Sequence, residues 1–403
     1  MSRIVDRFMK YISIDTQSDD DSTTSPSTAK QFRLARYLAE EMTEIGISDV
    51  RLDDRHCFVY GTIPANTVAK VPALGFIAHM DTAPRTPGDA SNARIHKNYD
   101  GGVIRLNDSV ALDPAIYPEL RDYIGCDLIV TDGVSLLGGD DKAGIAEIMT
   151  MAETLINTPS IPHGKIGIAF TSDEEVGRGI EYFDVEGFGM DYAYTVDGGV
   201  LGEIEYENFN AAAVKIHIKG RDIHPGYAKG IMINAVKIAA ELDRLLPQEQ
   251  RPEYTSGYDG FFHLIQLNGT EAEAESRYII RDHDAKLYSQ KVRLMLNCVA
   301  YLNDKYGNCI ELDIREQYRN MRELIEPHMF LIDNAKAAFK ACGVEPKVIP
   351  IRGGTDGARL TFEGLPCPNL STGGLNLHSN TEYMPVQSLE TMADVLIELV
   401  KIR

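Results

Sequence analysis

The chain has 403 residues, of which 44% are hydrophobic and 25% charged, so it is long enough for two domains that each bury a core. Sixty Asp and Glu against forty Lys and Arg give a formal net charge of −20, which disfavours nucleic acid as a partner. The longest apolar run, Val71 to Ala78, is far shorter than the roughly 20 residues needed to span a bilayer, so no membrane contact is expected.

The first part of the chain predicts alternating helices and strands. A helix is expected from about Ser27 to Glu44, with Gly46 as its stop, and another from about Lys142 to Leu155. The β-rich runs between and after them are CFVYGTI, ALGFIAHMD, KIGIAFTSDEE and DYAYTVDGG. Strands interleaved with helices in this way predict an α/β domain whose sheet is covered on both faces.

Residues 209–318 have a different rhythm. The runs AAAVKIHIKG, FFHLIQLNG, AESRYIIRD and CIELDIREQ read as strands, and IMINAVKIAAELDRLL and SQKVRLMLNCVAYLNDKYG read as helices. The order βαββαβ is the ferredoxin-like arrangement. Because α/β patterning returns afterwards, this stretch is interpreted as an insertion, which divides the chain into residues 1–208, 209–318 and 319–403.

Side chains that can bind metal fall at the ends of three predicted strands. They are His79 and Asp81 after Ala78, Glu174 and Glu175 after the strand that ends near Phe170, and Asp197 after Val196. In an open α/β sheet the ligand crevice lies outside the carboxyl ends of the strands. His79 and Asp81, two positions apart, would face the same region, which suits a metal ligand and its orienting partner.

Two further segments add candidates. GGDDKAG places Asp140 and Asp141 at a glycine-flanked helix entrance, and GGLNLHSNTEY offers His378 in a glycine-rich loop. Two histidines and several carboxylates, without a thiolate, suit zinc or a neighbouring divalent metal such as manganese or cobalt.

The segments AHMDT, GGDDKAG, TSDEEVG, VDGG and LHSNTEY occur in this order. Together they resemble the dinuclear zinc hydrolases that include aminoacylase, carnosinase-like dipeptidases and succinyl-diaminopimelate desuccinylase. The resemblance covers nearly the whole chain. It implies a zinc-exopeptidase-like catalytic domain, with a mixed sheet flanked by helices, and an inserted ferredoxin-like lid or dimerisation domain.

The resemblance also implies a pair of zinc ions per subunit. His79, Asp140 and Asp197 would hold one ion, and Asp140, Glu175 and His378 would hold the other, so that Asp140 bridges them. Asp81 would accept a hydrogen bond from the far nitrogen of His79. The peptide bond between Asp140 and Asp141 is expected to be cis, as is typical of the family.

Two catalytic roles follow from the same resemblance. Glu174, next to a ligand but not itself a ligand, would be the general base that takes a proton from water and delivers it to the leaving amine. His224, in the segment HPGYAKG, would donate to the developing oxyanion, within one chain or from a neighbouring subunit.

Substrate recognition is predicted more coarsely. The segments YIIRDHD and IRGGTDG match the tripeptide aminopeptidases of the family, and their Arg281 and Arg352 are candidates for binding a peptide carboxylate. Either arginine could instead form an ordinary ion pair. The expected activity is release of the N-terminal residue from tripeptides. A dipeptidase, an N-acyl amino acid amidohydrolase and a non-catalytic metal or peptide binder are the alternatives.

The six cysteines are scattered and form no CxxC pair, so none is assigned to a metal or a disulfide. Reduced thiols and the absence of a recognisable secretion signal favour a cytoplasmic location. The resemblance further implies a homodimer.

Overall fold

The computed structural model of the chain describes residues 2–84 and 86–402. It divides into two compact units: Met1–Tyr206 with Leu324–Ile349 and Thr355–Arg403, and Glu207–Glu323 with Pro350–Gly354. Among the described residues, no helix combines the length and the apolarity that crossing a bilayer would require.

The first unit is built on an eight-stranded mixed sheet with the strand order β1-β2-β8-β3-β9-β16-β10-β15. The strands are β1 (Ser48–Asp53), β2 (Phe58–Ile63), β3 (Leu74–His79), β8 (Ile166–Thr171), β9 (Tyr192–Gly198), β10 (Glu203–Glu205), β15 (Lys347–Val348) and β16 (Asn369–Ser371). β3 runs parallel to both of its neighbours, β8 and β9, whereas β1, β2 and β8 pair antiparallel. The buried β-rich runs of the sequence form the centre of this sheet.

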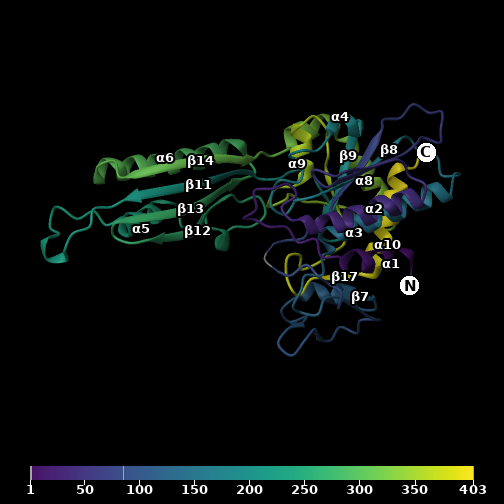
Figure 1. Cartoon of the computed structure of the whole chain (residues 1–403), viewed down its shortest axis with the longest axis horizontal. Helices are drawn as coiled ribbons and strands as arrows, with labels where there is room; N and C mark the ends of the chain where they lie inside the picture. The colour runs from purple at the N-terminus through teal and green to yellow at the C-terminus, as the bar shows by residue number, and fades with distance from the viewer. Residues whose placement is uncertain (1, 85, 403) are drawn as a thin grey trace. The chain divides into compact units, whose positions relative to one another are not determined.

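Helices cover both faces of the sheet, as predicted (Figure 1). They are α1 (Arg3–Ile12), α2 (Phe32–Glu44), α3 (Gly139–Asn157), α4 (Val185–Phe188), α8 (Phe330–Ala341), α9 (Asp356–Phe362) and α10 (Val386–Val400), while the short α7 (Arg322–Ile325) spans the boundary between the two units in the sequence. α3 packs on β3 and β9 and is itself covered by α1 and α10. On the other face, α4 and α9 share an apolar cluster with residues of β2, β3, β8 and β9.

Helix α3 lies unusually close to the sheet. A β-carbon on Gly144 would collide with the carbonyl oxygen of Val196 in β9. Only glycine allows the two backbones to approach this closely. The spacing between the start of α3 and the end of β9 is therefore set by backbone atoms alone.

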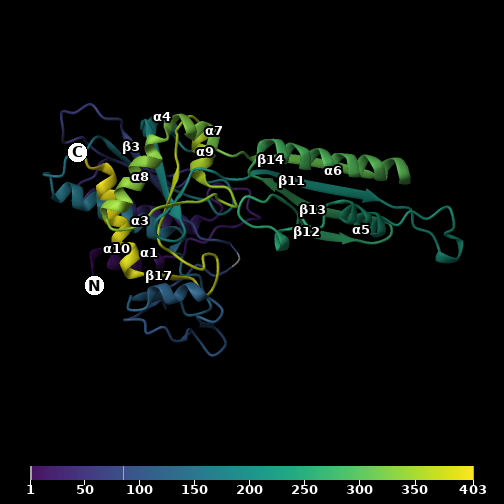
Figure 2. The same cartoon turned by 180° about the vertical axis from the view of Figure 1, so that it is seen from behind.

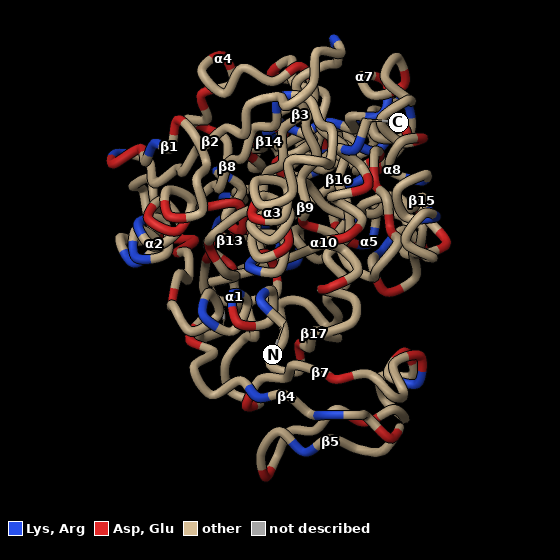
Figure 3. The backbone as a smooth tube through the Cα atoms, turned by 90° about the vertical axis from the view of Figure 1, so that its right-hand side faces the viewer, with Lys and Arg blue, Asp and Glu red and all other residues tan. Residues whose placement is uncertain are grey.

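A small lobe of the first unit was not predicted from the sequence. It contains the three-stranded sheet β17-β7-β4 and the hairpin of β5 and β6, seen at the lower end of Figure 3. The strands are β4 (Arg94–His96), β5 (Ile104–Arg105), β6 (Ala111–Leu112), β7 (Leu128–Val130) and β17 (Tyr383–Pro385). Strands of two or three residues are too short to show the alternation of apolar and polar residues that predicts a strand.

The second unit is a four-stranded antiparallel sheet in the order β12-β13-β11-β14 (Figure 2). Its elements are β11 (Asn210–Lys219), α5 (Ala235–Leu245), β12 (Phe261–Gly269), β13 (Glu273–Asp282), α6 (Ala285–Tyr306) and β14 (Ile310–Tyr318). One face packs against α5 and α6 around a core that includes Val214, Leu242 and Leu302. The predicted βαββαβ arrangement is confirmed.

Candidate metal centre

Three parallel strands bring polar side chains to one edge of the large sheet. In β3, His79 lies beside Thr171 of β8, and Ile77 lies beside Thr195 of β9. Because the three strands run in the same direction, the residues that follow them emerge at the same edge. Asp197, near the end of β9, is thereby placed next to His79.

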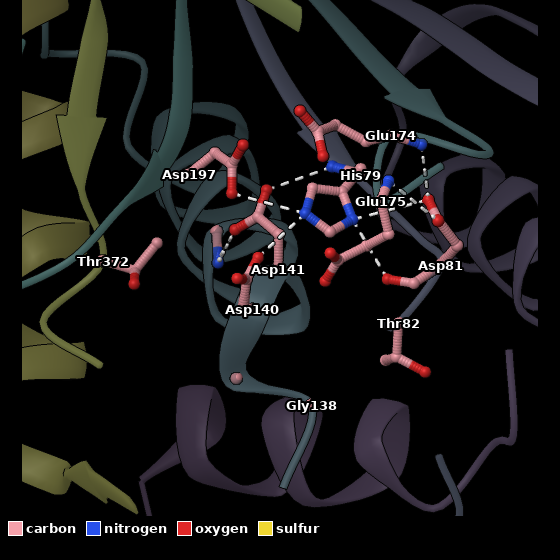
Figure 4. Close-up of polar contacts among 12 residues, drawn as sticks. His79, Asp81, Thr82, Gly138, Asp140, Asp141, Glu174, Glu175, Asp197 and Thr372 are labelled. Carbon is pink, nitrogen blue, oxygen red and sulfur yellow. Dashed lines mark hydrogen bonds and ion pairs between the residues drawn. The ribbon is translucent and has the colours of Figure 1, made fainter. Parts of the chain in front are cut away.

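His79 occupies the buried centre of this edge, with only 2% of its side chain exposed. Its Nε2 lies 2.9 Å from Oδ1 of Asp140 and 3.3 Å from Oδ1 of Asp197 (Figure 4). These residues come from β3, the start of α3 and β9. The sequence prediction that they converge is in agreement with these distances.

Asp140 stands at the entrance of α3, where Gly138 adopts a left-handed φ of +75° and the Asp140–Asp141 peptide bond is cis. While its Oδ1 contacts His79, its Oδ2 lies 2.9 Å from Nε2 of His378. One carboxylate thus contacts both histidines, one with each oxygen. This is the geometry that a carboxylate bridging two cations requires.

His378 also approaches a second carboxylate. Its Nε2 is 3.1 Å from Oε1 of Glu175, whose side chain is only 5% exposed. The His378 side chain is 55% exposed, and its backbone has a positive φ of 60°. The Asp140, Glu175 and His378 group is therefore the solvent-facing half of the centre.

Simple proximity groups the ligand atoms slightly differently from the prediction. Atoms of His79, Asp141 and Asp197 lie within 4.8 Å of one another, and so do atoms of His79, Asp140 and Glu175. The oxygens of Asp141, however, accept hydrogen bonds from the backbone N–H groups of His79 and Gly144. Asp141 is therefore engaged in holding the backbone, whereas Asp140 faces the histidines.

The pKa values of side chains in the centre are shifted because several carboxylates are buried close together. Burial raises the pKa of Asp197 to about 7, although the nearby His79 opposes this. Hydrogen bonds to Asp140 and Glu175 raise the pKa of His378 to about 11. Crowded carboxylates of this kind retain protons that a bound cation would displace. Imidazole and carboxylate ligands, with more carboxylates than histidines, fit a divalent metal.

Glu174 lies beside the centre without joining it (Figure 4). Among the described residues, no group donates a hydrogen bond to its carboxylate. Burial raises its pKa well above the ordinary value, and the charge of Asp356 adds to this effect. Asp356, in α9, accepts a hydrogen bond from Thr171 at the end of β8. An unpaired carboxylate with a raised pKa is suited to accept a proton near neutral pH.

The role predicted for Asp81, as hydrogen-bond acceptor for the far nitrogen of His79, stays a prediction. The imidazole Nδ1 of His79 lies 3.0 Å from the backbone carbonyl of Asp81 but 3.5 Å from its carboxylate. The carboxylate instead accepts the backbone N–H groups of Glu174 and Glu175, at 3.0 and 3.2 Å. Asp81 therefore faces His79 with both its main-chain carbonyl and its carboxylate, and the carboxylate also fixes the Glu174–Glu175 turn. Spacing along a strand could not reveal the contacts to this turn.

The same turn is held from its other side. Asp173 adopts a positive φ of 60° and accepts hydrogen bonds from the backbone and hydroxyl of Ser27 and from Gln31. These donors precede α2, so the polar loop near the start of the chain anchors the turn that carries Glu174.

The Asp81→Asn variant is expected to lower kcat by about 10- to 100-fold while the metal content stays unchanged. An amide cannot accept both N–H groups, so the Glu174–Glu175 turn would lose one anchor, whereas the main-chain contact to His79 would remain. Steady-state kinetics with metal analysis of the same samples measures both. Loss of metal in parallel with kcat would instead assign the carboxylate to orienting His79.

Comparison with known proteins identifies the family. Residues 206–308 match the M20 peptidase dimerisation domain. The peptidase T of Caldanaerobacter subterraneus subsp. tengcongensis is 51% identical to this chain, and the match covers 100% of this chain and 99% of that relative. The peptidase T of Parabacteroides distasonis is 50% identical, and the match covers 99% of this chain and 98% of that relative.

The chain belongs to the peptidase T family. Its closer resemblance to tripeptide aminopeptidases, deduced from the sequence, is thereby confirmed.

Solved structures agree with this family at the level of the fold. Aminopeptidase PepT from Bacillus cereus superposes with a TM-score of 0.78 at 23% identity, covering 99% of this chain and 97% of that one. A Staphylococcus aureus tripeptidase gives 0.79 at 21% identity, with the same coverage. A Bacillus subtilis dinuclear metal-binding peptidase of the M20 family gives 0.66 at 13% identity, covering 99% and 96%. The predicted fold class is confirmed.

Three residues predicted from the peptidase T motifs lie in the second unit. His224 is exposed, and its Nδ1 accepts the backbone N–H of Gly226. The Arg281 guanidinium packs 4.6 Å from the ring of Tyr318, with its buried Nη1 lacking a hydrogen-bond partner. Arg352 donates to the carbonyls of Gly257 and Asp259. Their participation in the site stays a prediction.

Sequence analysis also missed residues of the first unit that support the site. These are Asp173, Asp356 and Glu382, all buried. Asp356 and Glu382 lie inside segments that carried the peptidase T resemblance, IRGGTDGARL and LHSNTEY. A buried acid in such a segment was the available signal, but its partners are backbone or distant groups that no spacing rule identifies.

Proposed function

We propose that the chain is a metal-dependent aminopeptidase that releases the N-terminal residue from tripeptides. The observation that carries the proposal is the Asp140 carboxylate, which contacts His79 with one oxygen and His378 with the other. Glu174 lies beside this arrangement with its carboxylate unpaired among the described residues. Membership of the peptidase T family supports the choice of substrate.

His79, Asp140 and Asp197 would hold one ion, and Asp140, Glu175 and His378 the other. Zinc is the proposed metal because the ligands are imidazoles and carboxylates, with manganese and cobalt as alternatives. When bound, such a pair of ions lowers the pKa of a shared water to about 7 and polarises the scissile carbonyl.

Glu174 is proposed as the general base. Its carboxylate would accept the proton of the attacking water and then protonate the leaving amine, so that one residue serves both steps. A pure metal binder has no need of an unpaired, buried carboxylate at this place. The position of Glu174 therefore argues against a non-catalytic protein.

His224 is proposed as an oxyanion donor from the second unit. Because its Nδ1 accepts a hydrogen bond from Gly226, the neutral imidazole carries its proton on Nε2, which remains available to donate. His224→Ala should slow turnover more than it weakens metal binding, and an unaltered kcat would refute the role.

The two arginine candidates are no longer equivalent. Arg352 is engaged with backbone carbonyls and with the Thr255 hydroxyl, and it packs on Phe209. Arg281 keeps a buried nitrogen without a partner among the described residues. Burial lowers its pKa to about 10, so it stays charged at neutral pH. Arg281 is therefore the better candidate for binding a peptide carboxylate.

A hydrolysis panel tests the activity. Zinc-loaded protein should cleave free-amine tripeptides with a kcat/KM well above that for dipeptides, tetrapeptides and N-acetylated tripeptides, and it should release the first residue. Preference for a dipeptide or an N-acyl amino acid would favour the related dipeptidase or amidohydrolase. Absence of hydrolysis in a metal-loaded sample would leave a binding protein.

We also propose that the chain forms a homodimer and resides in the cytoplasm. The match to a dimerisation domain supports the first, and a sedimentation coefficient of a monomer at working concentration would contradict it. The six cysteines, none of which forms a disulfide, are typical of a reducing compartment. Cell fractionation tests the location.

A further inference from the structure

A buried carboxylate connects the two loops that carry Asp140 and His378. Glu382, only 1% exposed, accepts four backbone N–H groups with its two carboxylate oxygens. Oε2 accepts from Leu137 and Gly138 at 3.0 and 2.9 Å. Oε1 accepts from Gly139 and Asp140 at 2.7 and 3.2 Å. The last of these donors belongs to the bridging aspartate itself.

These N–H groups all find their acceptor in the same side chain. They lie at the entrance of α3, where a helix leaves its first N–H groups without intrahelical partners. The residue that would normally cap them is Gly138, which has no side chain. A carboxylate from more than 240 residues away therefore caps this helix, with charge-assisted bonds that are stronger than neutral ones.

Glu382 is itself anchored at the base of the His378 loop. Its backbone N–H donates to the carbonyl of Ser379, and the next residue, Tyr383, pairs with Leu375 on the far side of the loop and with Val130 of β7. The His378 loop is thus closed at its base, and Glu382 projects from that closure to the Asp140 backbone.

The fit around the carboxylate is tight. A β-carbon on Gly139 would lie 2.9 Å from Oε1 of Glu382, closer than side chains normally approach. The glycines before Asp140 therefore allow the acid to reach the backbone. The two loops are held together by this contact.

We propose that Glu382 is a positioning residue that sets the spacing between Asp140 and His378 and thereby the affinity of the solvent-facing metal group. The inference rests on the proposed function. The other metal group, His79, Asp140 and Asp197, is called the inner group. It depends less on Glu382, since His79 and Asp197 come from neighbouring strands and contact each other at 3.3 Å. His378, by contrast, lies on a loop outside the sheet, and its side chain is 55% exposed.

The test is titration of metal-free protein with Zn²⁺ alone, by calorimetry and by competition with a chelator. Wild-type protein should bind a pair of ions. In Glu382→Gln, the side-chain NH2 group would face backbone N–H groups, to which it cannot serve as a hydrogen-bond acceptor. The ion of the Asp140, Glu175 and His378 group should therefore bind about 10- to 100-fold more weakly, and the other ion within about threefold of wild type. Activity should recover at saturating Zn²⁺ with KM unchanged.

Glu205→Gln is the matched control. Glu205 is also buried in the first unit and accepts a hydrogen bond from Asn369, which the amide oxygen of glutamine can still receive. It should bind both ions as wild type does. If Glu382→Gln also does, or if saturating Zn²⁺ fails to restore its activity, the positioning role is wrong.

Gly139→Ala provides a second perturbation if Glu382→Gln does not fold. The added methyl group pushes on the carboxylate from the Asp140 side and should weaken the same ion. A folded Gly139→Ala protein with unchanged affinities would overturn the proposal. A wild-type protein that binds fewer than two ions would instead overturn the proposed function, so the two failures are distinguishable.

Discussion

Glu174→Gln is expected to lower kcat by about 10²- to 10⁴-fold, the usual contribution of general acid–base catalysis. The amide preserves the shape of the side chain but cannot take a proton from water. KM and metal content should change little, because Glu174 contacts neither histidine and its own backbone N–H stays bound to Asp81. Single-turnover kinetics on samples with a measured metal content separates the chemical step from binding.

The control for this prediction comes from the same segment. Glu181 is exposed and seven residues further along, so Glu181→Gln should keep wild-type kinetics. Retained turnover in Glu174→Gln would remove Glu174 from the mechanism. Loss of metal from Glu174→Gln would indicate that Glu174 is a metal ligand and not the general base.

Asp140→Ala is expected to abolish both metal binding and activity. Among the described residues, its carboxylate alone pairs with both histidines, so its removal leaves His79 with Asp197 and His378 with Glu175, two ligands for each ion. Structural and catalytic zinc sites use at least three protein ligands. Elemental analysis should find the content falling from two ions per chain to less than one.

His378→Ala sharpens this prediction. It should lose only the ion of the solvent-facing group, because the inner group contains no atom of His378. Asp304→Ala, at an exposed position of α6, should keep both ions. If Asp140→Ala retained one ion at full affinity, the shared-carboxylate arrangement would be wrong.

The sequence predicts the centre of the fold well because its strands are long and buried. β3, β8 and β9 are apolar runs followed by His79, Glu175 and Asp197, and parallel strands necessarily present such residues at one edge. Asp140 and His378 are candidates from glycine-rich segments that show no strand period, and the resemblance implied how they would share the ions. Periodicity and family motifs therefore contributed different parts of the same site.

What the sequence could not predict are the contacts between side chains and distant backbone. Asp81, Asp173 and Glu382 each hold main-chain N–H groups of another segment, and such partners depend on where the chain returns in space. The same reason explains the short strands β4 to β7, which exist only because a neighbouring strand pairs with them. Local sequence patterns predict neither these long-range contacts nor the pairing of the short strands.

The contact between Gly144 and Val196 limits how this active centre can be redesigned. Since a methyl group cannot be inserted there, an engineer who wishes to change the preferred ion or widen the catalytic opening has no freedom at Gly144. Sequence libraries would be better directed at positions whose side chains do not lie between a helix and the sheet.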